Sequence, residues 1–342
     1  MRAVEIFAYG GASEVLRITP DALPPVPASN EVLLQVAAAS VNPVDCAIRR
    51  GYGKEIFRPK GQVGTTPFPI RLGRDAAGTV IDVGSAVRKF KRGDRLYAAP
   101  NKATLAEIIA IPEDEAALAP PGLTELEAAS LPFVAMTAWN ALVAQVGIDK
   151  DSARGKRVLL TRGAGGVGSF AIQLLKAWDA FVAATTSTAN VEFVRSLGAD
   201  LVIDHTRETL QAVTPDFDVI LDSSFDRESE LLALLKTHAG ASYITITSPK
   251  VRLCDEFGIE EGSRKADALL ERRRREQAEL GRHYHWGFMR PSGTALAEVA
   301  GLVSRGATRA VVDRVFKMSD IIAAHEYCES GKARGKIVVD LT

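Results

Sequence analysis

The sequence predicts an α/β protein with two domains of different architecture, and three observations support this fold class. The 342 residues exceed the roughly 250–300 that one hydrophobic core usually supports. The pattern of the chain changes near residue 126, where short strands separated by Gly and Pro give way to alternating strands and helices. Four glycines fall within residues 163–168, between a strand-like and a helix-like segment. We therefore expect a strand-rich domain followed by a doubly wound parallel sheet.

The N-terminal region, residues 1–125, is expected to be irregular and rich in strands. Its β-type runs cover residues 31–40, 78–84 and 95–100. Stretches rich in Gly and Pro, such as PDALPPVP and APPG, separate these runs and predict loops. The region therefore has the pattern of a β-rich domain.

From residue 126 onward, apolar runs and helical segments take turns along the chain. The apolar runs cover residues 158–161, 181–186, 201–204, 219–222 and 243–247, and the helical segments cover 169–178, 191–197 and 228–235. Strands without hydrophobic alternation, separated by helices, are expected in a parallel sheet that is covered on both faces. This pattern predicts that the region forms the doubly wound domain.

Charge and composition exclude several classes of partner. Lys plus Arg and Asp plus Glu each total 42, which disfavours nucleic acid and anionic membranes and favours a small-molecule substrate. Cys46, Cys254 and Cys328 form no CxxC motif and suit a reducing compartment. The N-terminus lacks the apolar run of a signal peptide, and no later run reaches about 18 apolar residues. We expect a soluble, cytoplasmic protein without a membrane span; the mitochondrial matrix is the alternative if a targeting peptide was removed.

The glycine loop has the G-x-G-x-x-G spacing at Gly163, Gly165 and Gly168. Between a strand and a helix, such glycines provide a tight turn, an open approach for a pyrophosphate and close packing of the helix on the strand. The helix N-terminus adds amide donors and positive potential. A bare strand-to-helix turn is the structural alternative. We interpret the loop as a dinucleotide site formed by Gly163, Ala164, Gly165, Gly166, Val167 and Gly168.

The end of the following strand bears on which dinucleotide binds. An NAD site usually places an acidic residue there for the ribose 2′-hydroxyl, about 20 residues on, whereas residues 181–190 contain no acid. Hydroxyl side chains leave room for a 2′-phosphate, so NADPH is the expected cofactor. His205 has an alternative interpretation as an ordinary loop histidine, and Arg162, beside the first loop glycine, is similarly ambiguous. The residues assigned to the cofactor here are Thr186, Ser187, His205 and Ser223, with Arg207 as a further candidate for the phosphate.

Several sequence blocks in a fixed order carry a resemblance to a known family. They are GGASEVLRI (10–18), SVNPVDCAIRRGYG (40–53), FPIRLGRDAAGTV (68–80), VGSAVRKFKRGDRLYAA (83–99), AGGVGSFAIQLLKAWDA (164–180), LGADLVID (197–204), FDVILD (217–222), HYHWGFM (283–289) and GKARGKIVVD (331–340). The chain resembles a zinc-independent member of the medium-chain dehydrogenase/reductase superfamily, in its quinone oxidoreductase branch. The resemblance covers nearly the whole sequence.

The resemblance implies a domain layout and an activity. It places a GroES-like catalytic domain at residues 1–126 and 292–342, and a Rossmann NADPH-binding domain at residues 127–291. The ligand is expected in the cleft between the domains, and the activity is NADPH-dependent reduction of a quinone or an α,β-unsaturated carbonyl. By analogy with the superfamily, we expect a homodimer.

The residues at the expected metal positions do not favour zinc. Catalytic zinc in related dehydrogenases needs cysteine and histidine ligands, with the histidine in a Gly-His-Glu motif. The matching stretch here is Gly73-Arg74-Asp75, and Asn42 stands at the expected cysteine position. Cys46 has no obvious partner and is interpreted as a small buried residue. Without a Lewis acid the substrate must spread the charge left by hydride arrival, as conjugated carbonyls do.

Donors near the acceptor oxygen complete the expected active site. Asn42 and Tyr52 are candidates to contact substrate or cofactor, and Asp45 is a candidate orienting group. Each has a structural alternative, because Asn42 precedes a proline, Asp45 suits a helix cap and Tyr52 suits a pocket wall. Thr137, and Phe288 in the strand-like HYHWGFM, are further cofactor-side candidates. His283 and His285 alternate on that strand and are expected to be satisfied or exposed rather than metal ligands.

Residues 249–282 are the main idiosyncratic segment, with a helix-like stretch from Ala266 that contains four consecutive arginines. Pairing with Glu271 and Glu276 on a solvated helix is the simplest interpretation; a partner-docking surface or a lid is the alternative. The whole chain has a corresponding second interpretation. In this second interpretation, the chain is a nucleotide-binding interaction or scaffold protein that keeps the glycine loop but has little or no turnover.

Overall fold

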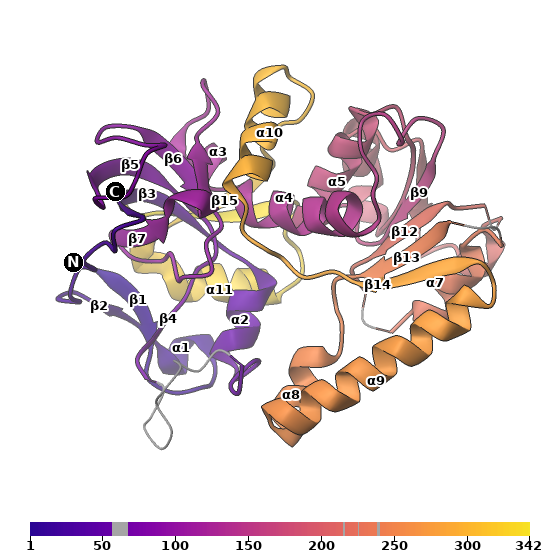
Figure 1. Ribbon diagram of the computed structural model, residues 1–342, viewed down its shortest axis with the longest axis horizontal. Coiled ribbons are helices and arrows are strands. Elements are labelled where there is room, and N and C mark those ends of the chain that lie inside the picture. Colours follow the sequence, from indigo (N-terminus) through magenta and orange to yellow (C-terminus); the bar gives the residue numbers. More distant parts are fainter. Residues whose placement is uncertain (57–67, 215, 225, 238–239) are drawn as a thin grey trace. The chain divides into compact units, whose positions relative to one another are not determined.

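The computed structural model describes residues 1–56, 68–214, 216–224, 226–237 and 240–342 (Figure 1). These residues form two compact units. The first unit comprises residues 1–136, 290–306 and 310–342, and the second comprises residues 137–289 and 307–309. Each unit has its own sheet and its own core. The predicted α/β fold class, with a β-rich domain and a doubly wound domain, is confirmed.

The first unit is built on two sheets whose strands are mostly antiparallel. One sheet has the order β2-β1-β4, and the other has the order β15-β16-β3-β5-β6-β8 with β7 also pairing with β3. These strands are β1 (Ala3–Ile6), β2 (Leu16–Thr19), β3 (Glu31–Val41), β4 (Ile70–Arg71), β5 (Ala76–Val83), β6 (Arg95–Ala98), β7 (Ile108–Pro112), β8 (Ala116–Leu118), β15 (Val312–Lys317) and β16 (Lys336–Asp340).

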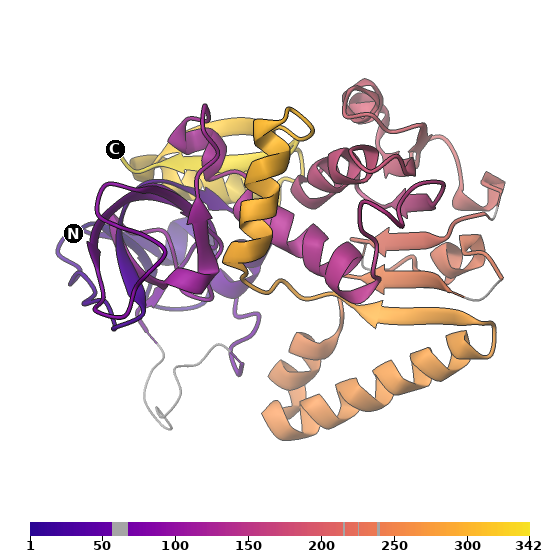
Figure 2. The same cartoon turned by 45° about the horizontal axis from the view of Figure 1, so that its top comes forward.

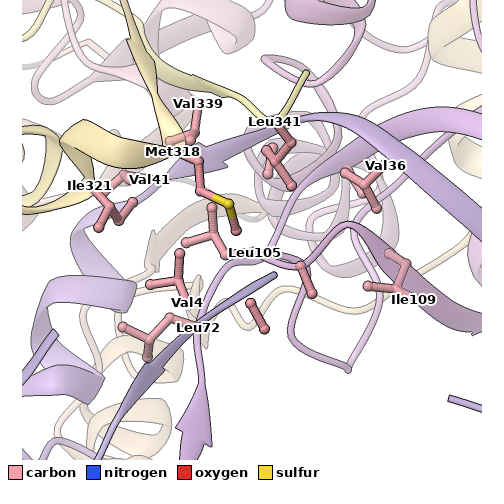
Figure 3. Packing of buried hydrophobic residues seen from close by; sticks show 14 of the residues in the cluster. Val4, Val36, Val41, Leu72, Leu105, Ile109, Met318, Ile321, Val339 and Leu341 are labelled. Carbon is pink, nitrogen blue, oxygen red and sulfur yellow. The ribbon is translucent and has the colours of Figure 1, made fainter. Parts of the chain in front are cut away.

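The helices of the first unit come from both ends of the chain. They are α1 (Ala12–Val15), α2 (Pro43–Arg49), α3 (Glu125–Ala128), α10 (Gly293–Ser304) and α11 (Ile321–Glu329). The core of this unit likewise mixes distant segments, because Val4, Leu72 and Leu105 pack with Met318 and Leu341 (Figure 3). The C-terminal segment therefore completes a domain that the N-terminal segment begins.

The second unit contains a fully parallel sheet of six strands, whose arrows point the same way in Figure 2. The order is β11-β10-β9-β12-β13-β14, which in chain order reads 3-2-1-4-5-6 and is the Rossmann arrangement. The order reverses next to β9, where such folds bind their ligands. The strands are β9 (Arg157–Leu160), β10 (Phe181–Thr186), β11 (Leu201–Asp204), β12 (Val219–Asp222), β13 (Ala241–Thr245) and β14 (Arg282–Trp286).

Helices and large aromatic residues cover the sheet of the second unit. Every residue of β12 and β13 is buried, as a strand covered on both faces requires. Tyr243 and Tyr284 stack with ring centroids 5.3 Å apart, in a core that includes Phe217 and Trp286. The helices are α5 (Gly166–Lys176), α6 (Val191–Ser196), α7 (Glu228–Leu234), α8 (Lys250–Phe257) and α9 (Ile259–Ala278).

The arginine-rich segment forms the long helix α9, which begins at Ile259 rather than near Ala266. The polar stretch IEEGSRK carries little apolar periodicity, and this is why the sequence did not indicate the first turns. Arg273 pairs with Glu228 at the start of α7 at 3.0 Å. Other arginines pair along the helix, as Arg274 does with Glu271 at 2.8 Å. Leu269 and Leu270 pack against the aromatic core.

One helical run among the described residues is long and apolar enough to cross a membrane. It covers residues 125–145, formed by α3, α4 (Pro132–Trp139) and a π-helical stretch from Asn140 to Gln145. Of its apolar 18-residue window, 67% is buried inside the protein. Core helices of globular proteins have the same length and composition, so this run is weak evidence for a span.

Candidate functional site

The glycine loop joins β9 to α5 in the second unit (Figure 1). Gly165 caps the helix, and its N–H donates to the carbonyl of Arg162 at 2.9 Å. Arg162 has a φ of 56°, a left-handed conformation that is uncommon outside glycine. The Arg162 N–H donates to Thr185 Oγ1 at 3.2 Å, which ties the loop to the neighbouring strand β10. The loop is therefore a defined structure.

Packing explains why the loop needs glycine at two positions. A Cβ atom on Gly168 would lie 2.5 Å from the carbonyl oxygen of Arg162 and 2.8 Å from Gly163 Cα. A Cβ atom on Gly163 would lie 2.9 Å from the Cβ of Ala184. All three distances are shorter than real Cβ atoms show. Gly163 and Gly168 thus let the first turn of α5 lie directly against the loop and against β10.

The amino end of α5 is suited to bind an anion. The first amides of a helix have no partner within it, and the helix dipole adds positive potential at this end. Helix α5 has eleven residues, and its first turn contains no acidic side chain. The loop and the helix therefore fit the diphosphate of a nucleotide, held by backbone amides. Ala164, Gly166 and Val167 lie in the same segment.

The ends of β10 and β11 form a second polar region. Thr186 closes β10 and is buried, Ser187 is half-buried, and His205 after β11 is exposed. The N–H of His205 donates to the carbonyl of Thr186 at 3.0 Å, which holds the two strand ends together.

Asp204 at the end of β11 is held by two threonines, an arrangement that we call the threonine clasp (Thr188, Asp204, Thr206). Thr188 Oγ1 donates to Asp204 Oδ2 at 2.6 Å, and Thr206 Oγ1 donates to Oδ1 at 2.6 Å. These hydrogen bonds, that of Thr188 first, lower the pKa of Asp204 below its usual value. Arg207 Nε lies 3.8 Å from Asp204 Oδ2. Sequence reasoning missed the clasp, although the hydroxyl-rich run after β10 was a signal.

A buried carboxylate also organises the end of β12. Asp222 Oδ1 accepts from Thr161 Oγ1 at 3.0 Å and from the N–H of Ser224 at 2.7 Å, and Asp222 Oδ2 accepts from the hydroxyl of Tyr243 at 2.7 Å. Burial and the neighbouring carboxylate raise the pKa of Tyr243, which stays protonated and donates. The N–H of the predicted residue Ser223 donates to Thr161 Oγ1 at 2.6 Å.

The structure gathers most of the predicted cofactor residues at one edge of one sheet. These residues all lie at the carboxyl ends of adjacent parallel strands: the glycine loop after β9, Thr186 and Ser187 at the end of β10, His205 after β11 and Ser223 after β12. Phe288 is two residues beyond β14 and is 37% exposed. Thr137 is buried on α4. The carboxyl edge of the parallel strands, where the glycine loop lies, is the edge at which open α/β sheets bind ligands.

The predicted catalytic residue Asn42 lies in the first unit, in a buried group that we call the polar centre (Ser40, Asn42, Asp75, Lys336). Asn42 is 1% exposed, and its Oδ1 accepts a hydrogen bond from Lys336 Nζ. Its Nδ2 donates to Asp75 Oδ2 at 2.9 Å. Lys336 Nζ also lies 3.0 Å from Asp75 Oδ2, and Ser40 donates to the same carboxylate. The Asn42 amide, the Asp75 carboxylate and the Lys336 ammonium thus provide hydrogen-bond and charge partners for one another.

Asp45 and Tyr52 belong to the same region of the chain. Asp45 is fully buried, and its carboxylate accepts from the N–H of Asn42 at 2.8 Å and from the N–H of Gly73 at 3.0 Å. Burial raises the pKa of Asp45. The first of these bonds caps α2, which is the structural role expected as an alternative. Tyr52 follows α2 and is half-buried, and its N–H donates to the carbonyl of Ala47 at 3.0 Å.

The residues at the expected zinc positions do not fit a zinc ion. Zinc ligands in proteins are thiolate, imidazole and carboxylate. The polar centre instead offers an amide and a carboxylate that already bind the ammonium of Lys336, and a hydroxyl that donates to the same carboxylate. Among the residues that the structure describes, no group of three or more His, Cys, Asp and Glu side chains is arranged to hold a metal.

A Rossmann sheet with this glycine loop, in one chain with a discontinuous β-rich unit, defines a medium-chain dehydrogenase/reductase. Family models agree with this class. Residues 28–121 match the alcohol dehydrogenase GroES-like domain, and residues 197–339 match a model described as zinc-binding dehydrogenase.

Curated relatives identify the family more narrowly. The chain is 39% identical to "NAD(P)H oxidoreductase RTN4IP1, mitochondrial" of Danio rerio, over 97% of this chain and 89% of the relative. Identity to the Homo sapiens protein of the same name is also 39%, over 97% and 87%. The chain belongs to this family of NAD(P)H oxidoreductases, which the sequence resemblance predicted. The names of these relatives include "mitochondrial", so the expected cytoplasmic location finds no support in them, whereas the alternative location does.

Two further comparisons point to the quinone oxidoreductase branch. A "Quinone-oxidoreductase homolog, chloroplastic" of Spinacia oleracea is 38% identical over 60% of this chain and 61% of the relative. The solved structure of the quinone oxidoreductase from Coxiella burnetii superimposes with a TM-score of 0.80 and 28% identity, covering 100% of this chain and 99% of the other.

Proposed function

We propose that the protein is an NADPH-dependent reductase that transfers a hydride to a quinone or an α,β-unsaturated carbonyl without zinc. The observation that carries the proposal is the pair of anion-suited regions in the second unit. One is the glycine loop at the amino end of α5, and the other is the acid-free end of β10. The relatives named NAD(P)H oxidoreductase and quinone-oxidoreductase homolog support this reading of the site.

The cofactor would be held mainly by backbone. The amides of residues 163–168 would bind the diphosphate, and Ser187 and His205 would bind the 2′-phosphate at the end of β10. When bound, NADPH supplies the hydride. The threonine clasp supports NADPH over NADH, because it engages the carboxylate of Asp204 and thus removes the group best suited to accept from a free ribose 2′-hydroxyl. Ser223, Thr137 and Phe288 remain proposed cofactor contacts.

We propose different roles for the three predicted catalytic residues. Asn42 and Asp45 are buried and engaged with Lys336, Asp75 and Gly73, so they would fix the shape of the segment that follows β3. Tyr52 is half-buried and offers a hydroxyl on the same segment, so it would contact the substrate. The Lys336 ammonium is already engaged with Asn42 and Asp75, and the proposed reaction uses no zinc. The acceptor would therefore have to stabilise its own developing charge, as quinones and enones do. Residues of this chain then act by positioning rather than by covalent catalysis.

An acceptor panel tests the function. Purified protein is mixed with NADPH or NADH and with ubiquinone analogues, enones, enals and simple ketones, and the loss of reduced cofactor is followed. The proposal predicts turnover with conjugated acceptors only, a preference for NADPH, and no zinc by elemental analysis. Tight NADPH binding without acceptor-dependent oxidation would favour the interaction or scaffold protein, and stoichiometric zinc needed for turnover would contradict the zinc-free reaction.

We also propose a homodimer, which the sheet of the second unit supports. Strand β14 is the last in the order, and its outer edge has no partner among the strands that the structure describes. An unpaired edge is a ready surface for a second copy of the same strand. Light scattering should give about twice the 36.7 kDa chain mass.

A further inference from the structure

Two of the three cysteines lie on two helices of the first unit that pack against each other, and the proposed reaction does not use them. Cys46 is on α2 and Cys328 is on α11, separated by 282 positions in the sequence. Cys46 Sγ lies 3.4 Å from His325 Nδ1 and 3.7 Å from the carbonyl oxygen of His325. Cys46 therefore contacts α11 at His325, three residues before Cys328 on the same helix.

Cys328 lies on the same face of α11 as the residue that Cys46 contacts. Side chains three residues apart are neighbours on a helix surface, and Cys328 is three residues after His325. Helices α2 and α11 pack against each other, and the two thiols are close enough for each to shift the pKa of the other. The two thiols therefore lie at one contact between the helices.

The two thiols differ in reactivity. The hydrogen bond from Cys46 and the charge of Lys336 lower the pKa of Cys328, against the opposing effects of burial, Asp45 and Glu329. The same hydrogen bond, together with burial, raises the pKa of Cys46. Cys328 is half-buried, whereas Cys46 is 5% exposed. Because the thiolate is the nucleophile, Cys328 is the thiol that reacts first with an oxidant.

We propose that Cys46 and Cys328 form a reversible disulfide when the protein meets a peroxide. The Cys328 thiolate attacks one peroxide oxygen, the O–O bond breaks, and a sulfenic acid and hydroxide form. The Cys46 sulfur then attacks the sulfenic sulfur, the S–O bond breaks, and the Cys46 proton leaves with the departing hydroxyl as water. Two thiols and one hydrogen peroxide thus give one disulfide and two waters.

The disulfide would join α2 to α11 next to the polar centre. Helix α2 begins directly after Asn42, and α11 leads to β16, which begins with Lys336. A covalent link would restrain both segments that form the polar centre. In a reducing compartment such a bond is transient, as redox-sensing disulfides are. The inference does not depend on the proposed acceptor or cofactor, because it concerns side chains of the first unit alone.

Thiol counting and peptide mapping test the proposal. Reduced full-length protein is treated with one equivalent of hydrogen peroxide, alkylated, digested without reductant and analysed by mass spectrometry. We expect a cross-linked peptide pair containing Cys46 and Cys328, a fall from three free thiols to one under denaturing conditions, and reversal by dithiothreitol. The oxidised protein should also show a higher Tm, because a cross-link restricts the unfolded chain.

Variants make the result specific. Cys254→Ser is the matched control, since Cys254 is the third cysteine and lies on α8; it should still lose two thiols. Cys46→Ser should leave a Cys328 sulfenic acid that dimedone traps, and Cys328→Ser should retain both remaining thiols. Cross-links that involve Cys254, intermolecular cross-links only, or persistence of all three thiols in the wild-type protein would each overturn the proposal.

Discussion

The glycine loop of the second unit and the polar centre of the first unit are constructed in opposite ways. The loop is one continuous segment, residues 163–168, whose shape depends on backbone and on missing side chains. The polar centre consists of side chains, and its Lys336 and Asn42 are 294 positions apart. The shape of the loop is therefore most sensitive to added volume. The polar centre is most sensitive to the loss of a charged partner, so substitutions in the two regions should affect different properties of the protein.

The largest expected effect is on the stability of the polar centre. Lys336→Met leaves the carboxylate of Asp75, which is fully buried, without its cation. Loss of one partner of a buried pair costs about 3–5 kcal/mol. Urea denaturation should show this decrease in the free energy of unfolding of the first unit, whereas binding of 2′-phospho-ADP-ribose to the second unit should change little.

Lys317→Met is the matched control for this substitution. Lys317 pairs with Asp340 at 2.7 Å, but its side chain is 59% exposed. Exposed pairs contribute about 0–1 kcal/mol, so this variant should be nearly as stable as the wild type. Equal losses in the two variants would contradict the role given to burial.

The next effect concerns cofactor binding. Gly168→Ala places a Cβ atom 2.5 Å from the carbonyl of Arg162, so the loop must shift. Overpacking of this kind costs about 1–3 kcal/mol, which corresponds to a roughly 5- to 150-fold weaker Kd. Calorimetric titration with NADPH measures it. At Gly165 the same added Cβ would meet that carbonyl at 3.3 Å, so Gly165→Ala should weaken binding less; the opposite ranking would refute this account of the loop.

A smaller effect is expected from pH. Burial, and then the charge of Arg49, lower the pKa of His325 from 6.5 to about 3. As pH falls below 6.5 the unfolded chain takes up this proton and the folded protein does not, so stability is fully present above pH 6.5 and is lost toward pH 3. By pH 5 the loss from this group is about 2 kcal/mol. Urea midpoints between pH 7 and 5 should fall in the wild type and fall less in His325→Gln.

His205→Gln provides the comparison for that experiment, because His205 is exposed. It should retain the pH dependence of the wild type. A wild-type stability that does not change between pH 7 and 5 would show that His325 is not held neutral in the folded protein.

The smallest effect tests the threonine clasp. In the variant with Thr188→Val and Thr206→Val, the carboxylate of Asp204 loses two hydroxyl donors and can move toward the end of β10. Repulsion of about 1 kcal/mol at a solvated site should raise the KM for NADPH roughly 5-fold. The KM for NADH should fall, because the released carboxylate can accept from the free ribose 2′-hydroxyl. Thr209→Val is the control outside the clasp. An equal rise for both cofactors would indicate a general distortion of the site instead.

Features encoded by neighbouring residues could be predicted from the sequence. The spacing of Gly163, Gly165 and Gly168 between an apolar run and a helical run indicated the loop and the doubly wound sheet, because both depend on contacts within a short stretch. The partners of Asn42 could not be predicted this way. Nothing near VNPVD indicates a lysine from the last strand, since a pair so distant along the chain is defined only by the completed fold. The hydroxyls of Thr188 and Thr206 were visible, but their shared carboxylate was not.

The pairing of β16 with β3 also has a consequence for biosynthesis. A ribosome makes β3 and the entire Rossmann sheet before it makes the strand that carries Lys336. Domains fold as units during translation, so the sheet of the second unit can form while the larger sheet of the first unit still lacks β15 and β16. Until Met318, Val339 and Leu341 emerge, the nascent chain exposes the apolar surface that they cover, and this interval is when it most needs a chaperone.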